Sequence, residues 1–128
     1  MTRRIRCVTT TRDGGASAAP FDTFNLGDHV GDDPAAVAAN RARLAESVGL
    51  GPDGIVWMNQ VHGDRVVVVD GPVDGAIDDA DGLVTTRPGL ALAVVTADCV
   101  PVLASDPRDG VVAAVHAGRA GAKLGVVA

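Results

Sequence analysis

The chain has 128 residues and a formal net charge of −5 at pH 7. This length predicts a single domain spanning 1–128, and a hydrophobic share of 47% with 21% charged residues is typical of a globular protein. The acidic balance and an aromatic content of only 2% argue against a nucleic-acid partner. No apolar run approaches the roughly 18 residues of a membrane span, so no membrane partner is expected.

The two cysteines, Cys7 and Cys99, are far apart in the sequence, and no C-x-x-C pair is present that would indicate a structural zinc knuckle. The basic start at 1–6 is not followed by an apolar stretch, which argues against a secretory signal. The cysteine-poor, alanine-rich composition therefore predicts a cytoplasmic protein, in which a disulfide between the two cysteines is not favoured.

The first third of the chain predicts one strand, one long loop and one helix. Residues 5–11 have the composition of a short strand, and 12–15 are turn residues with two glycines. A loop rich in Asp, Gly and Asn covers 21–33. The helix is expected over 35–48, with its start and end marked by the residues Asp32 or Asp33, Pro34 and Gly49.

The rest of the chain is dominated by short apolar runs that predict strands. Valine-rich, β-branched composition favours strand over helix in these runs, which cover 55–61, 65–69, 83–85, 90–96, 100–104 and 111–115. Runs that are apolar on both faces imply layers packed on both sides of a sheet. The expected fold class is α+β, with mixed sheets flanked by helices.

The segment 117–128 is glycine-rich and predicts a turn that opens a helix. We find no stop signal for this helix before the sequence ends, so we expect the chain to be incomplete at its carboxyl end.

Three reactive residues, His62, Cys99 and His116, each follow an apolar strand-like run and lie close to a turn. Side chains at the carboxyl ends of strands in one sheet can converge in one crevice, and two imidazoles with a thiolate are a suitable ligand set for zinc. Their wide spacing is compatible with another interpretation. A histidine at a strand end is often structural, and a cysteine among valines often serves as a small hydrophobic residue.

Four sequence blocks stand out between residues 58 and 118. They are Met58-Asn59-Gln60-Val61-His62-Gly63-Asp64, Ala80-Asp81-Gly82-Leu83-Val84-Thr85, Thr96-Ala97-Asp98-Cys99-Val100-Pro101-Val102 and Val115-His116-Ala117-Gly118. These blocks resemble one family, which was first named for a laccase domain or polyphenol oxidase and is now described as purine nucleoside phosphorylases with adenosine deaminase activity. The resemblance extends in order over nearly the whole chain.

The resemblance implies that His62, Cys99 and His116 bind zinc, with copper as the alternative metal. It implies phosphorolysis of adenosine, inosine and S-methyl-5′-thioadenosine, and deamination of adenosine, so that purine nucleoside and phosphate are the expected partners. It also implies two stacked sheets flanked by helices, in the layer order α/β/β/α.

Further roles are expected around this centre. Asp98 is a candidate for proton transfer, and Cys99 is counted with it as catalytic. The candidates for substrate binding are Asn25, Gln60 and Arg119. For Asp81 we expect a structural role in an Asp-Gly turn.

The chain departs from the family pattern in one block, where family members read H-A-G-W-R-G and this chain reads His116-Ala117-Gly118-Arg119-Ala120-Gly121. The tryptophan is missing and the arginine stands one position early, and family members are also considerably longer. Two alternatives therefore remain open: a cysteine hydrolase with Cys99 as nucleophile and a histidine as base, and an inactive, truncated module that binds zinc. Apolar surface left uncovered in a short chain predicts self-association.

Overall fold

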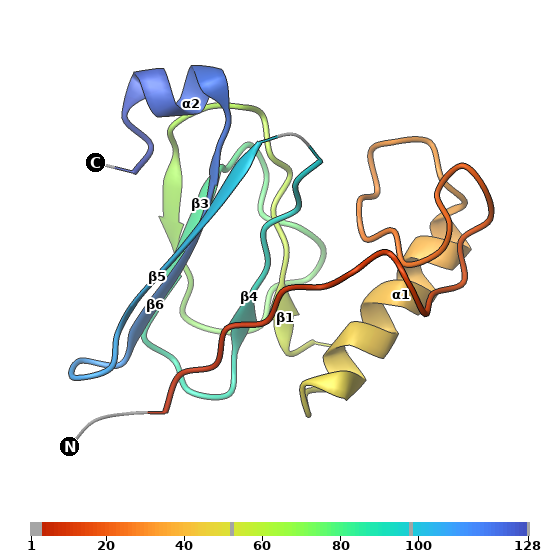
Figure 1. Ribbon diagram of the computed structural model, residues 1–128. Helices are drawn as coiled ribbons and strands as arrows, with labels where there is room; N and C mark the ends of the chain where they lie inside the picture. Colours follow the sequence, from red (N-terminus) through yellow and green to blue (C-terminus); the bar gives the residue numbers. More distant parts are fainter. Residues whose placement is uncertain (1–3, 52, 98, 128) are drawn as a thin grey trace. The chain divides into compact units, whose positions relative to one another are not determined.

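The computed structural model describes residues 4–51, 53–97 and 99–127 (Figure 1). These residues group into two compact units, Val8–Pro52 in one and Met1–Cys7 with Asp53–Ala128 in the other. No helix among the described residues is long and apolar enough to cross a membrane.

The unit Val8–Pro52 is built on the helix α1, Pro34–Ser47, whose ends each lie one residue before those of the predicted helix 35–48. The side chain of Asp33 caps it by accepting the backbone N–H of Ala35 at 3.0 Å, and Gly49 follows its end with a φ of 77°. These local signals suffice because they act between neighbouring residues.

The irregular loop of this unit is fastened to α1 by Asn40, which is 1% exposed. Its side-chain oxygen accepts the N–H of Ala16 at 2.7 Å, and its amide donates to the Ser17 hydroxyl at 2.9 Å and to the Asn25 carbonyl at 2.8 Å. Asp32 accepts a hydrogen bond from the Ser17 hydroxyl at 2.6 Å, and this bond lowers the pKa of Asp32. The predicted loop at 21–33 is confirmed, and hydrogen bonds from the side chains of Asn40 and Ser17 hold it in place.

The strand expected at 5–11 is absent, because its described residues form no strand pairing. The boundary between the two units falls within this segment, between Cys7 and Val8. The segment is therefore shared between the two compact units and adds no strand to either sheet.

The second unit contains one parallel sheet and one mixed sheet, which with the helices confirms the expected α+β fold class. A two-stranded sheet pairs β1 with β4 in parallel, and the larger sheet has the order β2-β3-β6-β5, parallel between β2 and β3 and antiparallel elsewhere. The strands are β1 (Ile55–Val56), β2 (Val66–Val68), β3 (Gly82–Thr85), β4 (Ala91–Leu92), β5 (Val100–Asp106) and β6 (Val111–Ala117). The core between them is small and aliphatic, and consists of Val56, Met58, Val69, Ala80 and Leu83.

The terminal helix α2, Arg119–Leu124, is shorter than expected. Gly125 ends it with a φ of 86°, and its N–H donates to the carbonyl of Ala122 at 3.2 Å. The prediction that this helix has no stop signal was wrong, because Gly125 is such a signal. Figure 1 shows α2 at the end of the sheet where β6 finishes and β5 begins.

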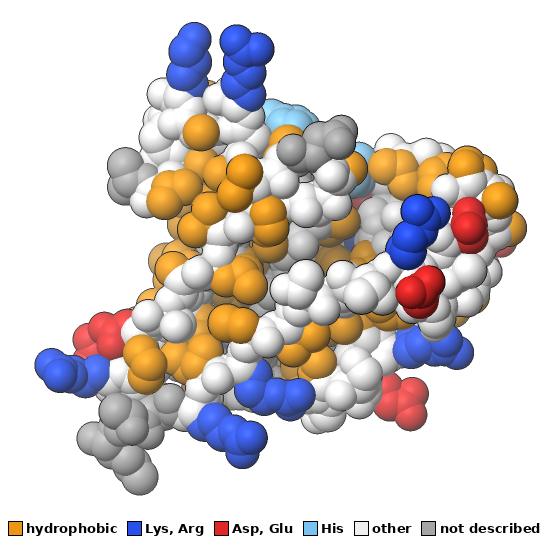
Figure 2. Space-filling model, in the orientation of Figure 1, with side chains coloured by type: hydrophobic (Ala, Val, Ile, Leu, Met, Phe, Trp, Pro, Cys, Tyr) orange, Lys and Arg blue, Asp and Glu red, His pale blue; other side chains and the backbone are white. Residues whose placement is uncertain are grey.

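The prediction that apolar runs are covered on both faces was wrong for β2 and β5. Val68 is 69% exposed and Val100 is 59% exposed, and Figure 2 shows hydrophobic side chains gathered over the larger sheet. Among the described elements, α2 packs against β6, and no helix makes a substantial contact with β2 or β5.

We expect the chain to self-associate through these exposed apolar side chains, because contiguous apolar surface of this kind favours burial against a partner. Sedimentation equilibrium should show a dimer or larger species at micromolar concentration. Two charged substitutions, Val68→Lys and Val100→Lys, should shift the protein toward monomer. A wild-type chain that sediments as a monomer over the whole concentration range would contradict this expectation.

Candidate metal centre

His116 lies near the end of β6 and is 3% exposed. Its Nδ1 lies 2.7 Å from the Oδ2 atom of Asp81, which is 0% exposed. A carboxylate at this distance accepts the Nδ1 proton and leaves Nε2 with its lone pair available, which is the arrangement commonly found around histidines that bind metals.

Cys99 directly precedes β5 and reaches the same end of the sheet. The antiparallel register pairs Val100 with Ala117 and Pro101 with His116, so the start of β5 lies against the end of β6. The sequence argument placed Cys99 at the carboxyl end of a strand, whereas it stands at the amino end of an antiparallel neighbour. Either arrangement would bring the Cys99 thiol to the same edge of the sheet as His116. The structure has the antiparallel one.

His62 lies in the loop after the bridge between Met58 and Ile77, with a left-handed φ of 60°. The loop is held by Asp81, whose carboxylate accepts the backbone N–H groups of Val61, His62 and Gly63 at 3.0, 2.9 and 3.0 Å. Three hydrogen bonds to one buried carboxylate stabilise a backbone conformation that is uncommon outside glycine.

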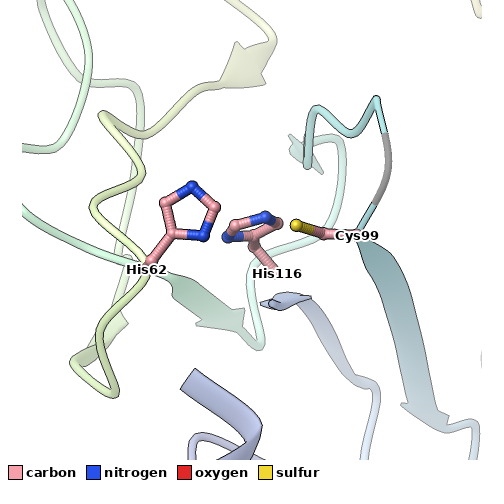
Figure 3. Close-up of side chains that lie close together, drawn as sticks. All are labelled: His62, Cys99 and His116. Atoms are coloured by element: carbon pink, nitrogen blue, oxygen red, sulfur yellow. The ribbon is translucent and has the colours of Figure 1, made fainter. Parts of the chain in front are cut away.

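The three side chains meet at one point. One ligand atom from each of His62, Cys99 and His116 lies within 4.8 Å of the others, and the two imidazole rings have centroids 4.8 Å apart with an interplanar angle of 73°. Figure 3 shows the rings and the sulfur directed toward one another. The convergence inferred from the sequence is therefore present.

Gly118 leaves the space between these ligands open. A Cβ atom at this position would lie 2.8 Å from His62 Nδ1, 3.3 Å from the Cys99 sulfur and 3.5 Å from His116 Cε1. A methyl group would thus stand among all three ligand side chains, in the region where an ion held by them would lie. The donor set of two imidazoles and one thiolate, together with this space, fits a zinc ion with one further open position.

Asp81 supports two of the three ligands at once, through the backbone of His62 and the ring of His116. Burial alone would raise its pKa, but the hydrogen bonds from His116 and from the amides of Val61, Gly63 and His62 outweigh burial and lower the pKa below its usual range. The sequence predicts only a structural turn at Asp81, and the long-range contact with His116 carries no local signal that could have revealed it.

Gln60 stands two residues before His62, and its side chain is hydrogen-bonded to the backbone of Val95, four residues before Cys99. Its amide donates to the carbonyl of Val95 at 2.7 Å, and its oxygen accepts the N–H of Val95 at 2.9 Å. The side chain therefore positions the segment before Cys99, and its contact with substrate stays a prediction.

The remaining predicted site residues lie in different places. Arg119 begins α2 and lines an open pocket together with His62, Cys99, Ala120 and Lys123. Asn25 belongs to the other unit, where its amide donates to the carbonyl of Gly27 and to the carboxylate of Asp32. The candidate proton carrier, Asp98, lies outside the described residues. Lys123 is the one pocket residue with reactive chemistry that the sequence argument did not select.

The thiols of Cys7 and Cys99 are both free in the structure. Two imidazoles share the neighbourhood of the Cys99 sulfur. A cysteine hydrolase needs one base beside its nucleophile, whereas a metal needs several ligands around one point, so this arrangement favours a metal site.

Fold and centre together define a family. The family model described as multi-copper polyphenol oxidoreductase laccase matches residues 6–128, and the chain belongs to this family. The match confirms the resemblance inferred from the sequence blocks.

Among individual proteins, the chain is similar to a purine nucleoside phosphorylase of Mycobacterium tuberculosis, with 75% identity over 97% of this chain and 50% of that protein. A purine nucleoside phosphorylase of Corynebacterium glutamicum is 61% identical over 98% of this chain and 52% of its own length. The crystal structure of YlmD from Geobacillus stearothermophilus superposes with a TM-score of 0.88 at 39% identity and covers 91% of this chain and 46% of YlmD. The chain thus spans about half the length of the curated relatives it matches.

Proposed function

We propose that this chain carries the zinc-binding part of a purine nucleoside phosphorylase that acts on adenosine, inosine and S-methyl-5′-thioadenosine and also deaminates adenosine. The convergence of His62, Cys99 and His116 around the space left by Gly118 is the observation that carries the proposal. The names of the similar proteins support the substrate class.

In phosphorolysis, a phosphate oxygen forms a bond to C1′ of the ribose while the bond from C1′ to the purine nitrogen breaks. The base leaves with a proton, and the sugar leaves as its 1-phosphate, which is ribose 1-phosphate from adenosine or inosine and its 5-methylthio analogue from S-methyl-5′-thioadenosine. In deamination, water adds at C6 of adenine and ammonia leaves. Both reactions need a polar pocket that orients the nucleoside beside an electrophilic or proton-transferring group.

The residues of this chain would divide the work as follows. His62, Cys99 and His116 would hold zinc, which when bound supplies a Lewis acid and an activated water. Asp81 keeps Nδ1 of His116 engaged and fixes the loop of His62. Arg119, at the rim of the same pocket, would attract an anionic reactant, and Asp98, Asn25 and Gln60 are proposed for proton transfer and nucleoside contacts.

Replacing Cys99 with serine should remove the metal, since a hydroxyl is a far weaker zinc ligand than a thiolate. We expect the wild-type chain to bind about one zinc ion. The zinc affinity of Cys99→Ser should be at least about 100-fold weaker, because loss of a ligand costs more than loss of a residue that only hydrogen-bonds to a ligand. Metal analysis after dialysis against a zinc buffer measures the difference. The matched control is Cys7→Ser, because Cys7 is an exposed free thiol.

An assay with adenosine and phosphate should accompany the metal analysis, on this chain and on a version with the length of its curated relatives. Turnover that requires zinc and disappears in Cys99→Ser supports the proposal. Turnover that resists a chelator would point to a cysteine hydrolase. Stoichiometric zinc without any turnover in the longer version would point to an inactive zinc-binding module.

A further inference from the structure

The short helix α2 carries a glycine in its interior, where glycine is a poor helix former. This residue, Gly121, is buried, and its φ is not in the left-handed region that would favour glycine. The backbone conformation at this position would therefore accept alanine. A glycine in such a place is explained by the close approach of another part of the chain.

Gly121 lies against the backbone beside two of the three ligand residues. A Cβ atom at position 121 would lie 2.7 Å from the carbonyl oxygen of Gly63, the residue that directly follows His62. It would lie 3.7 Å from the carbonyl oxygen of His116. Only the first of these contacts is too close for a methyl group, so the absence of a side chain at Gly121 concerns the loop of His62.

This loop and α2 are each held in place on the side away from their contact. The backbone N–H groups of His62 and Gly63 donate to the buried carboxylate of Asp81 at 2.9 and 3.0 Å. On the helix side, Val126 is 3% exposed, and its N–H donates to the carbonyl of Gly121 at 3.0 Å. A side chain inserted between the two segments would therefore have to displace one of them.

We propose that Gly121 is a positioning residue of the metal centre, which sets the separation of α2 from the His62 loop and thereby the place of the His62 imidazole. The proposal rests on the proposed function, in which His62 is a zinc ligand. The 2.7 Å separation falls about 0.7 Å short of the 3.4 Å at which ordinary contact begins. Binding constellations tolerate displacements of about 0.5 Å, and metal–ligand distances only about 0.2 Å. Alanine at this position would thus move one imidazole out of reach of an ion held by the other two ligands.

Cobalt(II), a spectroscopic substitute for zinc, tests this role in Gly121→Ala. We expect this variant to bind cobalt about 10- to 100-fold more weakly than wild type, the effect of disturbing the support of a metal ligand. The charge-transfer band from the Cys99 thiolate to cobalt should persist, because no contact of Cys99 is altered. The visible bands of the metal should change, because one imidazole is lost from its coordination.

Val126→Ala is the matched control, since it removes packing from the same end of α2 and adds no atom beside Gly63. It should lower the temperature of unfolding and leave the affinity for cobalt and the cobalt spectrum as in wild type. An equal change of the spectrum in both variants would mean that Gly121 acts only through the stability of the helix, and would overturn the proposal. Wild-type affinity and spectrum in Gly121→Ala would overturn it as well.

Hydrogen exchange in the metal-free protein separates this result from the fate of the proposed function. In Gly121→Ala, the amides of His62 and Gly63 should exchange about tenfold faster than in wild type, the effect of losing one hydrogen bond. The amides within β6 should keep their wild-type rates. Faster exchange at these two amides supports the positioning role even if the chain binds no zinc, and unchanged exchange contradicts it even if the zinc assay succeeds.

Discussion

Replacing Asp81 with asparagine should lower the free energy of unfolding by about 1–3 kcal/mol, the cost of leaving a buried hydrogen-bond donor without its acceptor. Asp81 accepts three backbone N–H groups and faces His116 Nδ1. An asparagine keeps the shape but turns one acceptor into a donor, so at least one buried N–H group loses its partner. Urea denaturation followed by circular dichroism measures the change.

The same substitution should weaken zinc binding by about 10- to 100-fold, because a partner that orients a ligand histidine is lost. Asp109→Asn makes the identical chemical change at an exposed site and should leave both stability and zinc binding near wild type. If Asp81→Asn unfolds at the same urea concentration as Asp109→Asn, the support that we assign to this carboxylate is wrong.

Replacing Gly118 with alanine should abolish zinc binding while leaving most of the fold intact. The added methyl group would stand 2.8 Å from His62 Nδ1 and 3.3 Å from the Cys99 sulfur. Gly118 has a φ of −75° and a ψ of 174°, which alanine adopts without strain. The cost therefore falls on the ligand side chains, which must move apart, and we expect a zinc affinity at least about 100-fold weaker.

Gly51→Ala is a suitable control for this variant, because a Cβ atom at Gly51 meets no heavy atom within 4 Å and its φ is not in the left-handed region. Competition with a chromophoric chelator measures zinc affinity, and thermal unfolding without metal measures stability. Wild-type zinc affinity in Gly118→Ala would show that the ion is not held in the space beside this glycine.

Local signals in the sequence were sufficient for the ends of α1, and short-range composition located every strand. Strand lengths were harder to predict, as 55–61 and 90–96 show. In the structure these runs contain only Ile55–Val56 and Ala91–Leu92. The side chain of Gln60 bonds to both backbone groups of Val95, so a side chain takes the place of a strand partner there. Periodicity cannot report such a contact, because it depends on residues 35 positions apart.

For the site, the reactive residue types and the family blocks were enough to select His62, Cys99 and His116. The reason for their convergence was only half anticipated. His116 stands at a strand's carboxyl end, but Cys99 reaches it through antiparallel register. Asp81 was assigned a turn, because the sequence shows its neighbour Gly82 and cannot show His116. Lys123 was not selected, because a lone lysine in a short helix usually faces solvent. In the structure it lines the pocket that also includes His62 and Cys99.

The carboxylate of Asp81 has a consequence for how the protein would handle its ion. Asp81 binds the backbone N–H of His62 and the imidazole ring of His116. Protein contacts alone therefore hold the His62 backbone and the His116 ring in place. The positions of these two ligands are therefore preorganised by the protein before an ion binds. The two imidazoles would then be in place to receive an ion without rearrangement of the His62 loop or of the His116 ring.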